Sequence, residues 1–416
     1  MDKTIVGGPR TGVVKVPASK SRAHRMLISA ALSLHESVLA VDGLSDDIRA
    51  TAACLTALGA GISFRGDTIT VRPITELPKG EAVLPCGESG STLRFLLPIV
   101  GALGVKAAFS LRGRLPERPL SPFKEELIAH GMSIVQTGDT LRVSGRLESG
   151  AFRLPGDVSS QFISGLLFAL PILKGDSRLL IEGRIESEDY VRMTEEQLLQ
   201  SGVLAERMDG GWQIKGAQRY NAPAHSTAEA DWSNAAFFLC MGALSRRGVC
   251  VTGLDPSSSQ GDRAILEILK CVGAHVEVGE GAVTVRRGEL LPVTVDASAI
   301  PDLVPALGAL LSVCEGESRV VNAARLRMKE SDRLKTTREM LCALGADVNE
   351  TPDGLVIRGQ SFLPGGEAES ANDHRIAMAS AVAACLSGGA IIKNAECVSK
   401  SYPEFWTHFD SLEADT

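Results

Sequence analysis

The sequence lacks a hydrophobic run long enough to span a membrane. Its longest apolar stretches, such as residues 303–314, end after about a dozen residues, whereas a membrane-spanning helix needs about 20. The N-terminal segment MDKTIVGGPRTGVVKV has neither the apolar core of a signal peptide nor the Arg- and Ser-rich pattern of a transit peptide. We therefore expect a soluble, cytoplasmic protein that begins at Met1.

Motifs for metals and nucleotides are also missing. The nine cysteines include no C-x-x-C pair, and the seven histidines include no H-x-H or H-E-x-x-H spacing. We therefore expect reduced, mostly buried thiols and no metal site. Neither G-K-S nor G-K-T occurs, which excludes the Walker loop of nucleotide-dependent kinases.

The chain has no excess of positive charge. Its formal net charge is -7 and its pI is about 5.6, which argues against a nucleic-acid or membrane partner. With 44% hydrophobic and 22% charged residues the chain is globular, and its length suits two domains of about 200 residues each. Any anion that this acidic chain binds must therefore meet a local cluster of basic residues.

Self-similar segments indicate that the chain is built from repeats. Segments rich in β-formers, such as AFSLRG and VCVTG, end in a small residue every 70 residues, at Gly43, Gly113, Gly183, Gly253 and Ala323, with a sixth at Ala395. A second marker, a small residue after a helical pattern, occurs at Gly59, Gly131, Gly202, Gly273 and Gly345. The two series predict six units of about 70 residues.

Each unit has the order α-β-α-β-β after a strand that enters from the preceding unit. In the fourth unit we expect a first helix over 233–246, a strand over 248–253, a second helix over 261–274 and a hairpin around 279–281. The sixth unit lacks its last hairpin. We expect the alternating N-terminal segment TIVGGPRTGVVKV to fold back and supply it.

The predicted fold is therefore α/β, with two domains of three βαβαββ repeats each. We place the first domain at residues 18–226. The second domain is discontinuous and combines residues 1–17 with 227–416.

The first helix of each unit begins with capping or small polar residues. The segments are SKSR at 19–22, SGST at 89–92, SSQF at 159–162, ADWS at 230–233, IPD at 300–302 and NDHR at 372–375. Capping explains each segment singly, but basic residues recur at corresponding points of the units: Lys20, Arg22, Arg25, Arg94, Arg118, Arg333, Arg375 and Lys400. Helix N-termini and basic side chains both attract anions, so we predict a cleft between the domains that binds several negative charges.

Eight segments carry more specific patterns. They are PASKSRAHR (17–25), GESGSTLR (87–94), PERP (116–119), DVSSQF (157–162), IPD (300–302), MKESDRL (328–334), NDHRIAM (372–378) and SKSYP (399–403). In this order they resemble the 5-enolpyruvylshikimate-3-phosphate (EPSP) synthases over essentially the whole chain. The resemblance implies an inside-out α/β barrel fold of two domains that close over their substrates. It also implies transfer of the enolpyruvyl group of phosphoenolpyruvate to shikimate 3-phosphate, through a tetrahedral intermediate, in aromatic amino acid biosynthesis by the shikimate pathway.

The resemblance implies two substrate sites. It assigns phosphoenolpyruvate to Lys20, Gly90, Arg118, Gln161, Arg333, Arg375 and Lys400. It assigns shikimate 3-phosphate to Ser21, Arg25, Ser159, Ser160, Gln161, Ser187, Tyr190, Asp302 and Lys329. A crowd of cations suits substrates with phosphate and carboxylate groups. Gly90 and Ser91 match a tight loop near the enolpyruvyl pocket, where glycine allows close approach of the backbone, and we expect glyphosate to compete with phosphoenolpyruvate there.

The implied reaction needs a base for the attacking hydroxyl and an acid for the methylene carbon. By resemblance, Asp302 acts on the hydroxyl, Glu330 donates the proton to carbon, and Lys20 assists proton transfer and stabilises charge. His374, beside Asp373, is either a structural or a catalytic histidine. We expect no cofactor, because phosphoenolpyruvate carries its own leaving group, and we expect a monomer.

Two positions depart from the family pattern, because Glu88 and Arg325 stand where Asn is common. Two alternatives remain to be separated. The related enzyme that transfers enolpyruvyl to UDP-N-acetylglucosamine has a catalytic cysteine in a loop whose counterpart here, residues 112–119, contains none. A non-catalytic anion-binding repeat protein would not place the carboxylates of Asp302 and Glu330 among its basic residues, because they repel anions.

Overall fold

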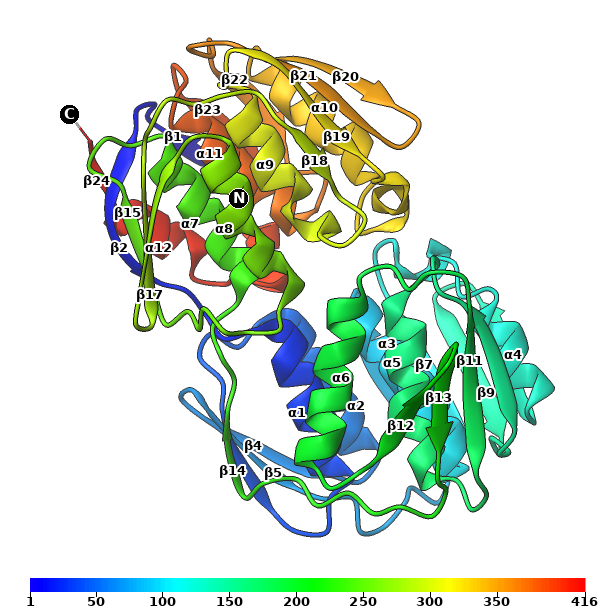
Figure 1. Cartoon of the computed structure of the whole chain (residues 1–416). Helices are drawn as coiled ribbons and strands as arrows, with labels where there is room; N and C mark the ends of the chain where they lie inside the picture. The colour runs from blue at the N-terminus through cyan, green and yellow to red at the C-terminus, as the bar shows by residue number, and fades with distance from the viewer. Residues whose placement is uncertain (416) are drawn as a thin grey trace. The chain divides into compact units, whose positions relative to one another are not determined.

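The computed structural model describes residues 1–415, which divide into two compact units. The continuous unit is Ala18–Ala228. The discontinuous unit combines Met1–Pro17 with the chain from Glu229 onward. In Figure 1 the blue N-terminal strands accordingly belong to the same unit as the yellow and red elements of the C-terminal half.

The described strands form six sheets, three in each unit. The continuous unit holds sheets with the orders β14-β3-β5-β4, β6-β7-β9-β8 and β10-β11-β13-β12. Their strands are β3 (Ser37–Ala40), β4 (Gly61–Arg65), β5 (Thr68–Arg72), β6 (Ala82–Gly87), β7 (Ala107–Leu111), β8 (Met132–Thr137), β9 (Thr140–Gly145), β10 (Ala151–Pro155), β11 (Ser177–Glu182), β12 (Ala205–Met208), β13 (Gly211–Ile214) and β14 (His225–Thr227).

The discontinuous unit holds sheets with the orders β16-β17-β15-β2-β24, β18-β19-β21-β20 and β1-β23-β22. Their strands are β1 (Lys3–Ile5), β2 (Arg10–Lys15), β15 (Val249–Thr252), β16 (His275–Gly279), β17 (Ala282–Arg286), β18 (Thr294–Asp296), β19 (Gly316–Val321), β20 (Asp347–Thr351), β21 (Gly354–Gly359), β22 (Gly366–Glu369), β23 (Ala390–Lys393) and β24 (Glu413–Ala414).

The pairing within the sheets repeats along the chain. The entering strand β6 is parallel to β7, β7 is antiparallel to β9, and β9 forms a hairpin with β8. The strands β18, β19, β21 and β20 pair in the same way. This is the βαβαββ order that the sequence predicts.

Two kinds of helix connect these strands. The first helix of each repeat is α1 (Lys20–Ala31), α3 (Gly90–Leu103), α5 (Ser160–Ala169), α7 (Trp232–Ala243), α9 (Val304–Leu311) or α11 (His374–Ala384). The second is α2 (Asp46–Ala57), α4 (Phe123–Ala129), α6 (Glu188–Gln200), α8 (Ile265–Cys271), α10 (Arg333–Ala343) or α12 (Phe405–Ser411). Short 3₁₀ helices are η1 (Leu115–Glu117), η2 (Leu170–Ile172), η3 (Gly261–Ala264), η4 (Pro301–Leu303), η5 (Ala324–Met328) and η6 (Ala395–Lys400).

The first helices form the core of their unit. In the discontinuous unit, every residue of α7, α9 and α11 is buried, and these three helices pack against one another. In the continuous unit, α5 packs against α3 and α6, and α6 against α1. A helix that is mostly apolar around its whole circumference is stable only when it is covered on all sides. The sheets provide part of this cover.

The predicted N-terminal hairpin is wrong, because its two strands belong to different sheets. β1 pairs antiparallel with β23 of the sixth repeat, whereas β2 lies between β15 and β24 as the entering strand of the fourth repeat. Alternation of apolar residues around Gly7-Gly8-Pro9 predicts two strands but not their partners. At Gly7, where the chain passes between sheets, an added Cβ would lie 1.9 Å from the carbonyl oxygen of Ser387.

Two further observations concern the helices. The helix predicted over 261–274 begins as η3 and continues as α8, which ends at Cys271.

Across residues 1–415, no helix combines the length and the apolar character needed to cross a membrane.

The partnership of β1 with β23 predicts how the N-terminus contributes to stability. Ile5 is 4% exposed and Val6 is 77% exposed. Ile5→Ala should lower the free energy of unfolding by about 2–5 kcal/mol, because it leaves a cavity beside the sheet, whereas Val6→Ala should change it by less than about 0.5 kcal/mol. Urea denaturation followed by circular dichroism measures both, and equal effects of the two substitutions would contradict the assigned pairing.

Candidate active site

In the discontinuous unit, the guanidinium of Arg333 is the centre of a cluster of charged side chains. The Arg333 side chain is 2% exposed. It donates hydrogen bonds to three carboxylates: Asp302 Oδ1 at 2.8 Å, Glu330 Oε2 at 2.6 Å and Asp373 Oδ2 at 2.8 Å. A planar guanidinium with five N–H donors can bind several acids at once. Arg333 therefore fixes Asp302 and Glu330 relative to each other.

Helix starts place these side chains. Arg333 is the first residue of α10, and Asp302 lies within η4. Asp373 is the N-cap of α11, where its carboxylate accepts the N–H of Arg375 at 3.0 Å. Acids are favourable at helix N-termini because the backbone N–H groups there lack helical partners. The starts of three elements thus converge on one cluster.

Three cations surround the Asp302 carboxylate. Arg375 donates from Nη2 to Oδ2 at 3.2 Å and from Nη1 to the Asp302 carbonyl at 3.1 Å. Lys329 Nζ lies 3.5 Å from Oδ1. Burial raises the pKa of Asp302, but Arg375, Lys329 and Arg333 outweigh burial and hold the pKa well below its usual value. Asp302 is therefore ionised at neutral pH and can accept a hydrogen bond from a hydroxyl.

Asp373 anchors the far side of the cluster. It is fully buried, and its Oδ2 also accepts the hydroxyl of Ser331 at 2.9 Å. Burial raises its pKa, yet the charge of Arg333 leaves the pKa below the usual value. Nearby, His374 Nδ1 lies 3.9 Å from Asp373 Oδ1, and Lys400 donates from Nζ to the carbonyl of Asn372 at 2.7 Å.

In the continuous unit, Arg25 joins α1 to α6. The side chain is buried, and its Nε donates to Thr194 Oγ1 at 2.8 Å. Its Nη1 donates to the Ser21 carbonyl and its Nη2 to the Tyr190 carbonyl, each at 2.7 Å. Burial and then the charge of Arg22 lower the pKa of Arg25 to about 9. Three residues that the sequence assigns to one substrate, Ser21, Arg25 and Tyr190, therefore lie together.

A second cluster of this unit surrounds the start of α3. Arg94 Nη1 donates to Gln161 Oε1 at 2.9 Å, and Gln161 Nε2 donates to Ser91 Oγ at 2.9 Å. A Cβ added to Gly90 would lie 2.6 Å from Arg94 Nη1 and 2.8 Å from Arg118 Nη1. Two guanidinium groups thus lie against the first residue of a helix, which is a favourable arrangement for an anion.

The remaining predicted residues of the continuous unit also lie at helix starts. Ser159 is the N-cap of α5 and accepts the N–H of Gln161 at 3.3 Å, and Ser160 is the first helical residue. Ser187 is the N-cap of α6, with a left-handed backbone (φ 53°). Lys20, the first residue of α1, forms an ion pair of 2.8 Å with Asp47 of α2.

A buried chain of hydrogen bonds connects three of these helices. His24 Nδ1 lies 2.7 Å from Thr51 Oγ1, Thr51 Oγ1 lies 2.6 Å from Thr92 Oγ1, and Thr92 donates to Ser89 Oγ at 2.7 Å. Burial, together with the charge of Lys20, holds the pKa of His24 well below its usual value. A neutral imidazole therefore links α1, α2 and the N-cap of α3, and fixes Lys20 relative to Gly90.

The cysteines and acidic groups of the described chain do not form a metal centre. No group of three or more His, Cys, Asp or Glu side chains in residues 1–415 could hold a metal ion. All nine cysteines are free thiols.

Comparison with known proteins identifies the family. The profile of the EPSP synthases, described as 3-phosphoshikimate 1-carboxyvinyltransferases, matches residues 6–409. The chain belongs to the EPSP synthase family. A 3-phosphoshikimate 1-carboxyvinyltransferase from Clostridium kluyveri is 43% identical over 411 residues, which cover 96% of this chain and 95% of the relative. A relative of the same name from Brachyspira hyodysenteriae is 38% identical over 420 residues, which cover 100% and 99% of the two chains.

Solved structures show the same fold. An EPSP synthase from Acinetobacter baumannii superposes with a TM-score of 0.79 at 24% identity and 99% coverage of both chains. NikO, an enolpyruvyl transferase from Streptomyces tendae, superposes with a TM-score of 0.78 at 19% identity, covering 99% of this chain and 97% of its own. The predicted inside-out α/β fold is confirmed. The family profile and the curated relatives show that the chain is an enzyme of the transferase class, and they do not favour the two alternative functions.

At the two positions that depart from the usual EPSP synthase pattern, the side chains lie against the backbone. Arg325 Nη2 donates to the Ser298 carbonyl at 2.7 Å. The Glu88 carboxyl group lies so close to Gly113 that an added Cβ would be 2.5 Å from Glu88 Cδ. Arg325 thus links η5 to the segment that follows β18.

Sequence reasoning gave no role to three residues of this EPSP synthase site. Asp373 was noted only as the neighbour of His374, Arg94 only as a recurring cation, and Asp47 not at all. Asp373 and Asp47 lie at helix starts, like the residues that were assigned. An acidic residue at the start of a helix can pair with a nearby cation. This pattern marks Asp373 and Asp47 in the sequence.

The buried Asp373 predicts an acid dependence of stability. A carboxylate whose pKa is lowered in the folded state stabilises that state above its unfolded pKa of about 4, and this contribution is lost as the pH falls through the folded value. Asp373→Asn should therefore reduce the slope of unfolding free energy against pH below about pH 4. It should also cost about 3–5 kcal/mol at pH 7, because Arg333 loses a buried partner.

Chemical denaturation at a series of pH values measures both effects. Asp347→Asn is the matched control, because Asp347 is 47% exposed and pairs with Arg358 at the surface, where an ion pair contributes about 0–1 kcal/mol. The same slope for Asp373→Asn and for the unsubstituted protein would refute the assigned role.

Proposed function

We propose that this chain transfers the enolpyruvyl group of phosphoenolpyruvate to the 5-hydroxyl of shikimate 3-phosphate and releases phosphate. The observation that carries the proposal is the Asp302 carboxylate, which is held ionised by Arg333, Arg375 and Lys329 beside Glu330. Membership of the EPSP synthase family supports the choice of both substrates.

In this proposal, phosphoenolpyruvate binds to the cations and the helix start. Its ligands are Lys20, Gly90, Arg118, Gln161, Arg333, Arg375 and Lys400. The guanidinium groups of Arg94 and Arg118 beside Gly90 support a phosphate position at the start of α3, and Gln161 holds Ser91 of the same turn. Arg333 and Arg375 suit the carboxylate and phosphate because a planar fork binds two oxygens.

Shikimate 3-phosphate, by the same proposal, binds mainly to the continuous unit. Its ligands are Ser21, Arg25, Ser159, Ser160, Gln161, Ser187 and Tyr190, together with Asp302 and Lys329 from the discontinuous unit. The contacts of Arg25 with the backbone of Ser21 and Tyr190 support this site, as do the serines at the starts of α5 and α6. Phosphate is a common ligand of such helix starts.

The proposed reaction is an addition followed by an elimination. Asp302 accepts the hydrogen bond of the 5-hydroxyl, whose oxygen attacks the substituted carbon of the enolpyruvyl group, and Glu330 donates a proton to the methylene carbon. Asp302 takes up the proton that the hydroxyl loses. The tetrahedral intermediate then returns a proton from the new methyl group to the Glu330 carboxylate as the bond between the substituted carbon and the phosphate oxygen breaks, and the departing phosphate takes the proton from Asp302. Lys20 assists proton transfer and offsets negative charge on phosphate, and its pairing with Asp47 supports its position in the site.

The ligands that we propose for the two substrates come from both units. We further propose that the enzyme acts as a monomer in the cytoplasm without a cofactor, and its nine free thiols suit a reducing compartment.

Phosphate release tests this function. With phosphoenolpyruvate, the protein should release phosphate on addition of shikimate 3-phosphate and not on addition of UDP-N-acetylglucosamine. Glu330→Gln should slow this release by about 10²–10⁴-fold, the usual contribution of a general acid, while both substrates still bind in calorimetric titrations. Activity with the nucleotide sugar alone would overturn the proposed acceptor.

The matched control for Glu330→Gln is Glu339→Gln in α10. Glu339 is 49% exposed and pairs with Lys335 and Arg338 at the surface, so the substitution should leave turnover unchanged. If Glu330→Gln and Glu339→Gln have the same turnover, Glu330 has no part in the reaction.

Gly90 provides a separate test through the inhibitor glyphosate, which should compete with phosphoenolpyruvate. In Gly90→Ala the new methyl group must displace Arg94 or Arg118, because it would lie 2.6 and 2.8 Å from their Nη1 atoms. We expect the inhibition constant to rise by about tenfold or more. Gly80→Ala is the control, since a Cβ there meets nothing within 4 Å. Unaltered inhibition of Gly90→Ala would place the inhibitor elsewhere.

A further inference from the structure

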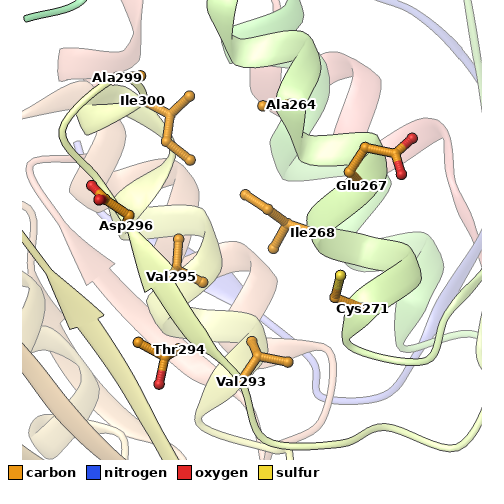
Figure 2. A pocket seen from close by; sticks show the side chains of 10 residues that line it. All are labelled: Ala264, Glu267, Ile268, Cys271, Val293, Thr294, Val295, Asp296, Ala299 and Ile300. Atoms are coloured by element: carbon orange, nitrogen blue, oxygen red, sulfur yellow. The ribbon is translucent and has the colours of Figure 1, made fainter.

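Two interior features have no role in the assignments above. The first is a cavity of about 320 Å³ between α8 and β18 of the discontinuous unit. Figure 2 shows Ile268 facing Val295 and Ile300 across it, and its mostly aliphatic walls do not favour one class of ligand over another. The second is the buried chain of hydrogen bonds in the continuous unit, which leads to the proposed phosphate position at the start of α3. Its members His24, Thr51 and Thr92 are called the relay below.

The direction of the hydrogen bonds in the relay can be assigned. Thr92 donates its hydroxyl hydrogen to Ser89 Oγ at 2.7 Å. A hydroxyl has only one hydrogen, so Thr51 is the donor in its contact of 2.6 Å with Thr92. Thr51 must then accept from His24, whose Nδ1 lies 2.7 Å from its Oγ1. The proton of the ring is therefore on Nδ1, and every hydrogen bond points from His24 towards Ser89.

The surroundings of the His24 ring agree with this tautomer. The residue is 1% exposed, and burial holds its pKa well below the usual value, so the ring is neutral and carries one proton. Its Nε2 is buried and has no hydrogen-bond partner within residues 1–415. A buried N–H without an acceptor is rarer in proteins than an acceptor with a spare lone pair. The proton is therefore better placed on Nδ1, where Thr51 accepts it.

This direction fills the acceptor capacity of Ser89, the N-cap of α3. Ser89 Oγ accepts twice from Thr92, from the hydroxyl at 2.7 Å and from the backbone N–H at 3.3 Å. A hydroxyl oxygen has two lone pairs, so Ser89 Oγ cannot accept another N–H of the helix start. The backbone N–H groups of Gly90 and Ser91 have no acceptor in the described part of the chain.

We infer that the relay positions the start of α3 for phosphoenolpyruvate. By saturating Ser89 Oγ, it keeps the N–H groups of Gly90 and Ser91 available for the phosphate. With the opposite direction, Ser89 would donate to Thr92 and keep a free lone pair, which could accept the Ser91 N–H, since N-cap side chains bind the second or the third N–H of a helix. This inference rests on the proposed function, which places the phosphate of phosphoenolpyruvate at this helix start.

The tautomer of His24 tests the relay without any substrate. In ¹⁵N NMR spectra the ring should have a protonated Nδ1 and an unprotonated Nε2, and neither signal should titrate between about pH 6 and pH 8, where an ordinary histidine does. A proton on Nε2 would reverse the relay and overturn the inference.

Thr92→Val tests the effect of the relay on substrate binding. The substitution removes the hydroxyl and leaves Ser89 with a free lone pair. The KM for phosphoenolpyruvate in phosphate release should rise by about tenfold, because a donor to its charged phosphate is lost, while the KM for shikimate 3-phosphate should change by less than about twofold. Thr92→Ser keeps the hydroxyl and should restore the KM for phosphoenolpyruvate.

Thr337→Val is the matched control. Thr337 is 0% exposed, and its hydroxyl has no hydrogen-bond partner in the described chain, so its substitution should leave both KM values unchanged. A parallel rise of both KM values in Thr92→Val, or an equal effect of Thr92→Ser, would show a general disturbance of the fold and overturn the inference.

A titration of the unsubstituted protein decides the matter where Thr92→Val does not fold. Phosphoenolpyruvate should shift the amide NMR signals of Gly90 and Ser91 more than that of Thr92, whose N–H is bound to Ser89. Unshifted signals of Gly90 and Ser91 would overturn the inference. Because the tautomer and the titration need no turnover, a protein that binds phosphoenolpyruvate but releases no phosphate would contradict the proposed function and not the relay.

Discussion

The cluster of charged side chains around Asp302 depends on one buried interaction. The guanidinium of Arg333 binds the carboxylates of Asp302, Glu330 and Asp373. Burying acids is unfavourable unless opposite charge and hydrogen bonds compensate for the lost water. Arg375 and Lys329 complete this compensation around Asp302. The cluster therefore keeps the Asp302 carboxylate ionised inside the protein.

The inside-out fold explains how so many polar groups converge. Apolar helices such as α7, α9 and α11 fill the interior of a unit, and several of their polar residues lie in the first turns. The polar residues at the first turns of these helices lie together because the helices themselves pack together. The repeat thus delivers several helix N-termini, with their unpaired N–H groups, to one end of each unit.

Much of this arrangement could be predicted from the sequence. Regular spacing of small residues predicts the repeats, and polar residues at helix starts predict binding of anions, whereas the individual site residues are implied by the resemblance to the EPSP synthases. The N-terminal strands show the limit of such reasoning. Alternation in residues 3–15 marks strands, but pairing of β1 with β23 and of β2 with β15 depends on contacts across more than two hundred residues. Asp47 and Asp373 were missed for the same reason, because ion-pair partners are set by packing and leave no local pattern.

The position of β2 has a consequence for how the chain folds. This strand, Arg10–Lys15, is synthesised early and lies between β15 and β24, which come much later in the sequence. During synthesis the continuous unit can fold as soon as its own residues emerge, whereas the discontinuous unit must wait for the last residues of the chain. Until then the apolar face of the N-terminal segment lacks its neighbours. During synthesis the enzyme therefore passes through a partly folded state, in which the N-terminal strand β2 has not yet paired with β24.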